Sequence, residues 1–237
     1  MTWGGGTTDF SLFEVQKPAS PGDKPQVERV AVSDHLLLGG DNIDLALAHL
    51  LEARLTVDGT QLPQTALASL IAQARSLKEK ALTTAVEDKE EHHVAIAKGG
   101  SSLFAGALTA TMTAGELKDH ILNGFFPHCD RDDGPEVVVT GLREWGLPYA
   151  KDTAITRHLA QFVAGRKIDA VLYTGGSLKP VFLQERLTEL LTKWQGTSPI
   201  VLENTAMDFA VASGAGNYGK ALRTRKGKIK SGYARSL

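Results

Sequence analysis

The spacing of apolar residues divides the first half of the chain into short strands and two long helices. Residues 8–15 and 27–32 alternate between apolar and polar positions, which predicts an antiparallel hairpin. Leucines and alanines recur at helical spacing over 41–57 and 65–85, which predicts two amphipathic helices. Further strands are expected at 93–97 and 102–110, again as a hairpin.

The second half begins with helix signals and ends in alternating strands and helices. Thr113 and Glu116 have the spacing of a capping box and predict a helix that ends near Leu122. Asp152 is expected to cap a helix that ends near Ala164. The last third is predicted to contain a strand at 170–173, a helix at 181–194, a second strand at 199–202 and a second helix at 207–222. This order implies a mainly parallel sheet that binds a ligand at the carboxyl ends of its strands.

Composition and charge exclude several classes of protein. The chain has 237 residues, a formal net charge of -1 and a single cysteine, Cys129, so no internal disulfide can form. No apolar run is long enough to span a bilayer, and no signal peptide precedes the first strand, so we expect a cytoplasmic location. The basic residues after position 219 are interpreted as a solvated tail, with a contact to nucleic acid or to an acidic partner as the minority interpretation. The abrupt start and end suggest a piece of a longer protein.

Three glycine-rich segments suggest the chemistry. Residues 4–9 read GGGTTD, residues 39–41 read GGD before a predicted helix, and residues 175–177 read GGS between a predicted strand and helix. Glycines let a backbone approach a ligand closely, and successive N–H groups there can bind an anion. Several such turns in one chain favour a polyphosphate such as that of ATP, with Asp9 steadying the first turn. The alternatives are an ordinary hairpin turn at 4–7 and an ordinary strand-to-helix turn at 175–177.

Two other groups of residues have a plainer interpretation. Asp208 opens a helix of small residues and is either an ordinary N-terminal acid or a ligand contact. The segment around His128, Cys129 and Asp130 contains possible metal ligands, but its spacing matches no standard zinc pattern. We expect no metal bound by side chains there.

Four segments together resemble the nucleotide-binding domain of the DnaK-like heat-shock chaperone family. GGGTTDFSL from residue 4 resembles its second phosphate loop, and HLLLGGDNID from residue 35 resembles its leucine-glycine-glycine-acid stretch. VLYTGGS from residue 171 resembles its adenosine-side turn, and DFAVASGA from residue 208 resembles its last nucleotide-contacting helix. The segments occur in the family's order and span nearly the whole chain. The resemblance implies an α/β fold: an actin-like ATPase (ribonuclease H-like) lobe with a mixed sheet flanked by helices.

The resemblance also implies a domain plan and a nucleotide site. Residues 1–56 and 113–222 would form a base subdomain, 57–112 an inserted α+β upper subdomain, and 223–237 a basic tail that continues into a further region. ATP or ADP with Mg²⁺ would bind in a cleft completed by a first lobe that this chain lacks. The residues expected at the nucleotide are Gly5, Gly6, Thr7, Gly39 and Gly40 near the phosphates, Gly175, Gly176, Ser177, Lys179 and Asp208 near the adenosine, and Lys78, Lys80 and Thr83 from the upper subdomain.

The parent protein implied by the resemblance is a slow ATPase, and this chain alone is expected to be inactive. Its partners would be the first lobe, further domains, co-chaperones and client proteins, with no membrane and no nucleic acid. One departure is Thr2, which stands where the family has an aspartate, and another is the irregular segment 125–150. Both favour the first alternative, a non-hydrolysing actin-like scaffold. The second alternative, an actin-like small-molecule kinase, would need a sugar pocket and an acidic base, for which the sequence gives no signal.

Overall fold

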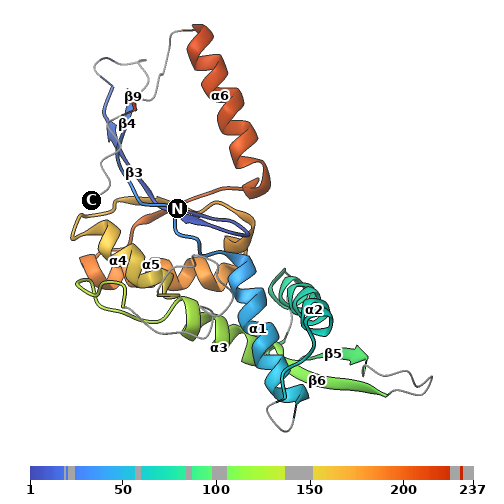
Figure 1. The fold of residues 1–237 in the computed structure, drawn as a ribbon. Coiled ribbons are helices and arrows are strands. Elements are labelled where there is room, and N and C mark those ends of the chain that lie inside the picture. Colours follow the sequence, from blue (N-terminus) through green and yellow to red (C-terminus); the bar gives the residue numbers. More distant parts are fainter. Residues whose placement is uncertain are drawn as a thin grey trace. The chain divides into compact units, whose positions relative to one another are not determined.

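The computed structural model describes residues 1–18, 20, 25–56, 60–83, 87–97, 106–136, 152–224 and 230–231. These residues form a mixed α/β structure of helices and small sheets (Figure 1). The chain divides into two compact units. The first unit contains Met1–Leu38 and Cys129–Leu237, and the second contains Gly39–His128. The upper subdomain expected at 57–112 lies inside the second unit, which also includes α1 and α3, so the expected boundaries stay a prediction.

The second unit packs three helices with one hairpin. Its elements are α1 (Gly40–Leu55), α2 (Gln64–Thr83), β5 (Glu91–Ala97), β6 (Ala107–Thr113) and α3 (Ala114–Phe125). β5 and β6 are antiparallel, and one face of the hairpin is buried through Val94, Ile96, Ala110 and Met112. Helix α1 packs against α2, with Leu47, Leu51 and Leu70 fully buried. Burial of this apolar stripe is the main source of stability for such helices.

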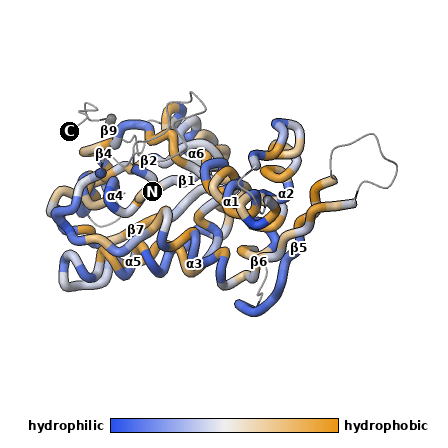
Figure 2. The backbone as a smooth tube through the Cα atoms, turned by 60° about the horizontal axis from the view of Figure 1, so that its bottom comes forward, coloured by the Kyte–Doolittle hydropathy of each residue, from blue (hydrophilic) through white to orange (hydrophobic). Residues whose placement is uncertain are grey.

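The first unit is built from short sheets and three longer helices. Its first elements are β1 (Thr2–Trp3), β2 (Thr8–Asp9), β3 (Ser11–Gln16) and β4 (Gln26–Val32). The later elements are α4 (Ile155–Val163), β7 (Ala170–Leu172), η2 (Gly176–Leu178), α5 (Val181–Gln195), β8 (Ile200–Leu202), η3 (Met207–Phe209), α6 (Ala210–Thr224) and β9 (Lys230–Ser231). Figure 2 shows hydrophobic and hydrophilic residues alternating along α5, whose apolar side is buried through Leu183, Leu187, Leu190 and Leu191.

Strand pairing in the first unit combines local hairpins with contacts between distant segments. β1 pairs antiparallel with β2, and β3 with β4. β7 and β8 are parallel, as the alternation of strands and helices predicted. Thr2 of β1 also bridges in parallel to Thr174, which follows β7. This bridge brings the N-terminal hairpin alongside the segment that contains the second glycine turn.

Most predicted elements are confirmed within a few residues. The hairpin of β3 and β4, the helices α1, α2 and α5, and the capping box of α3 are present. In that capping box the Thr113 hydroxyl accepts from the Glu116 amide, and the Glu116 carboxylate accepts from the Thr113 amide. Local sequence signals account for these elements because the groups that define them are close in the chain.

Three expectations need correction. The predicted strand 8–15 is divided at Phe10 into β2 and β3, and β3 is largely exposed. Asp152 does not cap α4, because the N-cap of this helix is Ala154. The Asp152 carboxylate accepts instead from the backbone amides of Ala154 and Glu136. The strand expected at 102–110 ends three residues later than predicted, because β6 (Ala107–Thr113) continues to Thr113, and its expected start lies outside the described residues. The expectations for the turn at 98–101 and for the irregular segment after residue 136 lie outside those residues.

Candidate functional site

The first glycine turn closes the hairpin of β1 and β2. The Gly4 amide donates to the Thr7 carbonyl at 2.9 Å, which places Gly5 and Gly6 at the tip. Both glycines are exposed, and within the described part of the chain their amides have no hydrogen-bond partner. The ordinary interpretation as a hairpin turn is therefore correct for the backbone, and the turn also presents two unpaired N–H groups. Unpaired amides of this kind are suited to an anion.

The second glycine turn lies directly against β1. The Trp3 amide donates to the Thr174 carbonyl at 3.0 Å, and the Thr174 amide donates to the Met1 carbonyl at 3.0 Å. Gly175 has a φ of +93°, and a Cβ placed there would lie 2.3 Å from the Trp3 carbonyl oxygen. Only glycine allows the two backbones to approach so closely.

A side-chain hydrogen bond joins the two turns. The Ser177 hydroxyl donates to the Gly4 carbonyl at 3.1 Å, across 173 positions of sequence. Gly4 and Ser177 therefore lie side by side, so the two glycine turns adjoin, and their shared use by one nucleotide stays a prediction. Within the described residues the amides of Gly176 and Ser177 are also without a partner. The first unit thus presents unpaired N–H groups from two adjoining turns.

Asp9 organises the base of the first turn, as expected. Its carboxylate accepts from the Thr7 hydroxyl at 3.4 Å and pairs with the Nδ1 atom of His35. The neighbouring Thr8 hydroxyl donates to the Leu38 carbonyl at 2.6 Å in the interior. The His35 contact joins residues 26 positions apart, and no local sequence pattern indicates it.

Two further predicted contacts follow the second turn. Lys179 is exposed directly after η2. Asp208 lies in the backbone of η3, which leads into α6, and its side chain is outside the described residues. Their roles near a base or ribose stay predictions.

The predicted residues of the second unit lie on two packed helices. Gly39 is the N-cap of α1, and its amide donates to the Asn42 side chain at 2.7 Å, so that N–H group is already used. Gly40 is the first helical residue, as the glycine pair before a helix predicted. Lys80 is exposed on α2, and Thr83 is the last residue of that helix, with its side chain outside the described residues.

Lys78 has a structural partner that the sequence analysis missed. Its ammonium contacts the Gly40 carbonyl at 3.0 Å and the Asp44 carboxylate at 2.5 Å. Asp44 is fully buried and also accepts from Arg75 at 2.8 Å, an interaction that raises the pKa of Arg75. A nucleotide contact through Lys78 would therefore compete with this ion pair. The sequence did contain a signal for a buried Asp44. This residue has the same helical spacing as Ala48, Leu51 and Leu55, so it lies on the buried stripe of α1 and needs a cationic partner there.

The possible metal ligands near Cys129 serve local structure. Burial raises the pKa of the Cys129 thiol, and the Trp194 indole donates to its carbonyl at 3.0 Å. Asp130 pairs with Lys193 at 2.8 Å, which lowers the pKa of Asp130, and its amide donates to Asp133. Among the residues that the structure describes, no group of three or more His, Cys, Asp or Glu side chains could hold a metal ion.

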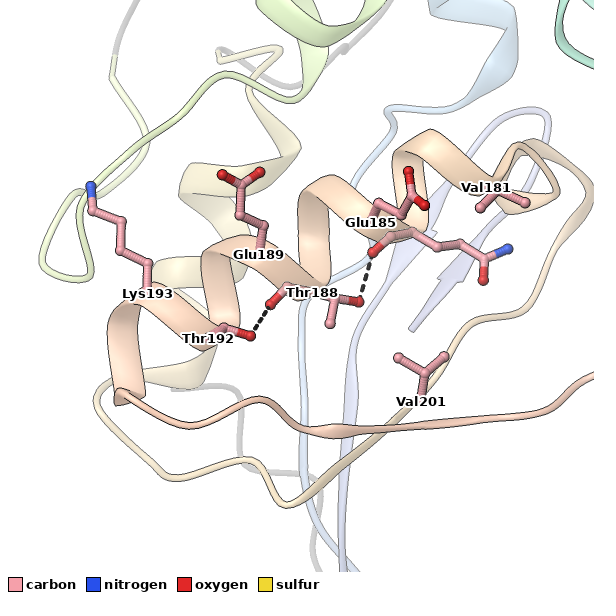
Figure 3. A pocket seen from close by; sticks show the side chains of 8 residues that line it. Val181, Glu185, Thr188, Glu189, Thr192, Lys193 and Val201 are labelled. Atoms are coloured by element: carbon pink, nitrogen blue, oxygen red, sulfur yellow. Dashed lines mark hydrogen bonds between the residues drawn. The ribbon is translucent and has the colours of Figure 1, made fainter.

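A separate groove runs along α5. Its volume is about 600 Å³, and Figure 3 shows the side chains that line it, which include two valines, two glutamates and a lysine. Seven lining residues come from α5 and the eighth is Val201 of β8; none is a predicted nucleotide contact. The hydroxyls of Thr188 and Thr192 are already bonded to backbone carbonyls within the helix. Glu185 and Glu189 place two carboxylates in the groove, and Lys193 already pairs with Asp130, so the groove is unsuitable for a phosphate.

Comparisons with known proteins do not identify the chain. No protein-family model matches it, and no curated protein matches it. The resemblance to the DnaK-like family therefore stays a prediction from the four segments. In the described parts of the chain, no helix is both long and apolar enough to cross a membrane.

Proposed function

We propose that this chain is an ATP-binding lobe of a DnaK-like ATPase with an actin-like fold. The observation that supports the proposal is the junction of the two glycine turns, where Ser177 donates to the Gly4 carbonyl. The resemblance linked these turns to the phosphates and to the adenosine of one nucleotide. A ligand bridging two adjoining turns is the simplest use of both motifs.

Phosphate binding would rest on backbone amides. Gly5 and Gly6 provide unpaired N–H groups at one turn, and Gly176 and Ser177 provide them at the other. Such amides are already oriented, so they lose little entropy when an anion binds, and they carry no charge that would need desolvation. The Ser177 hydroxyl retains acceptor capacity toward a ribose because its hydrogen is directed at Gly4.

Mg²⁺ fits the chemistry of the first turn. Thr7 and Asp9 supply hydroxyl and carboxylate oxygens, the ligand type that Mg²⁺ prefers, together with phosphate oxygens and water. The ion would offset the repulsion between the Asp9 carboxylate and a polyphosphate. When bound, it would neutralise charge on the phosphates during hydrolysis in the parent protein, where water attacks in line. This chain would position the phosphates through its backbone amides and would bind the ion through Thr7 and Asp9.

The second candidate is a scaffold that keeps the fold without binding a nucleotide. Thr2 favours it, because this residue is part of β1 and pairs with Asp9, and it provides no carboxylate where the family has one. Isothermal titration calorimetry with MgATP and MgADP separates the two functions. The proposal predicts saturable binding with one site per chain, and absence of binding favours the scaffold. ADP formation that depends on an added sugar, with the phosphoryl group transferred to that sugar, would instead favour a small-molecule kinase.

A pair of glycine variants makes the titration specific. Gly6→Ala places a methyl group in open space at the tip of the first turn, so the fold is kept while phosphate access is reduced. Gly134→Ala is the matched control, since its Cβ also meets open space in the same unit. We expect at least tenfold weaker MgATP binding for Gly6→Ala and no change for Gly134→Ala. Equal affinities in the two variants would contradict the assigned role of this turn.

A further inference from the structure

Helix α6 carries an apolar stripe that its own chain leaves exposed. Val211, Ala215, Tyr218 and Leu222 follow one another at spacings of four, three and four residues, so they lie on one face of the helix. All four are exposed, and Val211 is 84% exposed. The main contacts of α6 with another element are to η3, which directly precedes it. An apolar stripe of this length normally packs against a partner surface.

The parallel pair of β7 and β8 has a matching exposed face. The register places Leu172 opposite Leu202 and Ala170 opposite Ile200, so these four residues lie on one side of the pair. All are exposed, and Ile200 is 68% exposed. Parallel strands are almost always covered on both faces. The other side, through Val201, borders the α5 groove (Figure 3).

We infer that two copies of this chain associate through these surfaces, with the α6 stripe of each copy on the β7–β8 face of the other. Both surfaces are present on every chain, and a reciprocal contact in which each copy uses both surfaces closes with two-fold symmetry. Charge agrees with this pairing. α6 contains Lys220 and Arg223 and no acidic residue, whereas exposed Glu203 directly follows β8.

The buried area favours a reciprocal contact over a single docked helix. A helix of 15 residues is about 22 Å long and about 10 Å wide, so one side of it covers roughly 350 Å². A stable interface needs roughly 800 Å² from each partner. In the reciprocal arrangement each copy contributes both its helix and its strand face, which gives about 700 Å² per partner. One helix alone supplies less than half of what is needed.

Helix α6 lies in the chain between two short elements of the first unit. At its start, η3 joins it to β8, and β9, which follows it, pairs in parallel with β4, through Glu28 with Lys230 and Arg29 with Ser231. A second copy covers the stripe and leaves both of these elements in place.

Sedimentation velocity over a range of concentrations tests the inference on the full chain. Wild-type protein is expected to dimerise reversibly, and Val211→Asp and Ile200→Asp are each expected to weaken the dimer at least tenfold, since each puts a charge into an apolar contact. Val15→Asp is the matched control, because Val15 is also exposed, at 65%, but lies on β3. It should leave the dimer unchanged. Circular dichroism checks that the variants stay folded.

Cysteine crosslinking gives a second readout that does not depend on the strength of the dimer. A mixture of Val211→Cys and Ile200→Cys chains should form a disulfide-linked dimer on mild oxidation. Wild-type protein, whose single cysteine Cys129 is buried, is the control and should form no such dimer. Wild-type protein that is monomeric at every concentration would overturn the inference. So would a dimer unaffected by both aspartate variants, or the absence of any crosslink between Val211→Cys and Ile200→Cys chains.

Discussion

Substitution of Gly175 tests the close approach that joins the two turns. Its φ of 93° and ψ of 144° lie in a region that side chains rarely adopt, and occupying it costs about 1–3 kcal/mol. A methyl group would also stand 2.3 Å from the Trp3 carbonyl oxygen, and the backbone of β1 would have to move away. That movement breaks the two hydrogen bonds that Thr174 makes with Met1 and Trp3, worth about 0.5–1.5 kcal/mol each. Gly175→Ala should therefore destabilise the protein by about 2–6 kcal/mol.

The assay is urea unfolding of the full chain followed by circular dichroism, with Gly196→Ala as the matched control. Gly196 also has a positive φ, of 75°, but a Cβ there meets nothing within 4 Å. Its substitution should cost only the backbone strain, about 1–2 kcal/mol. Equal destabilisation by the two variants would refute the reasoning, because the crowding against Trp3 would then contribute nothing.

Three other predictions concern the second unit. Asp44→Ala should cost about 3–5 kcal/mol in urea unfolding, because it leaves Lys78 half-buried without its carboxylate, whereas exposed Asp41→Ala should cost about 1 kcal/mol or less; similar values would contradict a buried ion pair. Burial lowers the pKa of His120 below 6.5, so its contribution to stability is present above that pH and is lost as the pH falls. The melting temperature should therefore fall less between pH 7.5 and 5.5 in His120→Gln than in the wild-type protein. An equal fall in both proteins would contradict the role of His120. Thr113→Ala should cost about 1 kcal/mol through loss of the cap, and no loss in thermal melts would count against the capping box.

Elements whose signals are local could be predicted from the sequence. The start of α1 at Gly40, the capping box at Thr113 and the pairing of β3 with β4 each depend on groups within a few residues or across one turn. Gly175 was singled out as part of a glycine turn, and its φ shows why glycine is needed there. At these positions, local backbone geometry alone restricts which element can form or which residue type can be present.

Contacts between distant segments could not be predicted in detail. β1 has two residues, too few for any periodicity, and its position depends on the hydrogen bonds that Thr174 makes with Met1 and Trp3 across the chain. The pairs of Asp9 with His35 and of Asp44 with Lys78 join separate elements in the same way. The glycine turns and the resemblance both suggested that several turns hold one polyphosphate, but no local pattern indicates the contact between Ser177 and Gly4.

The most direct test of the central claim is amide NMR of the chain during titration with MgATP. The proposed function predicts that the amide signals of Gly5, Gly6, Gly176 and Ser177 shift together and saturate at one concentration, because one polyphosphate contacts both turns. The Gly134 signal serves as the reference and should stay unchanged. Shifts at neither turn, or at one turn alone, would contradict the claim that the two turns form a single nucleotide site.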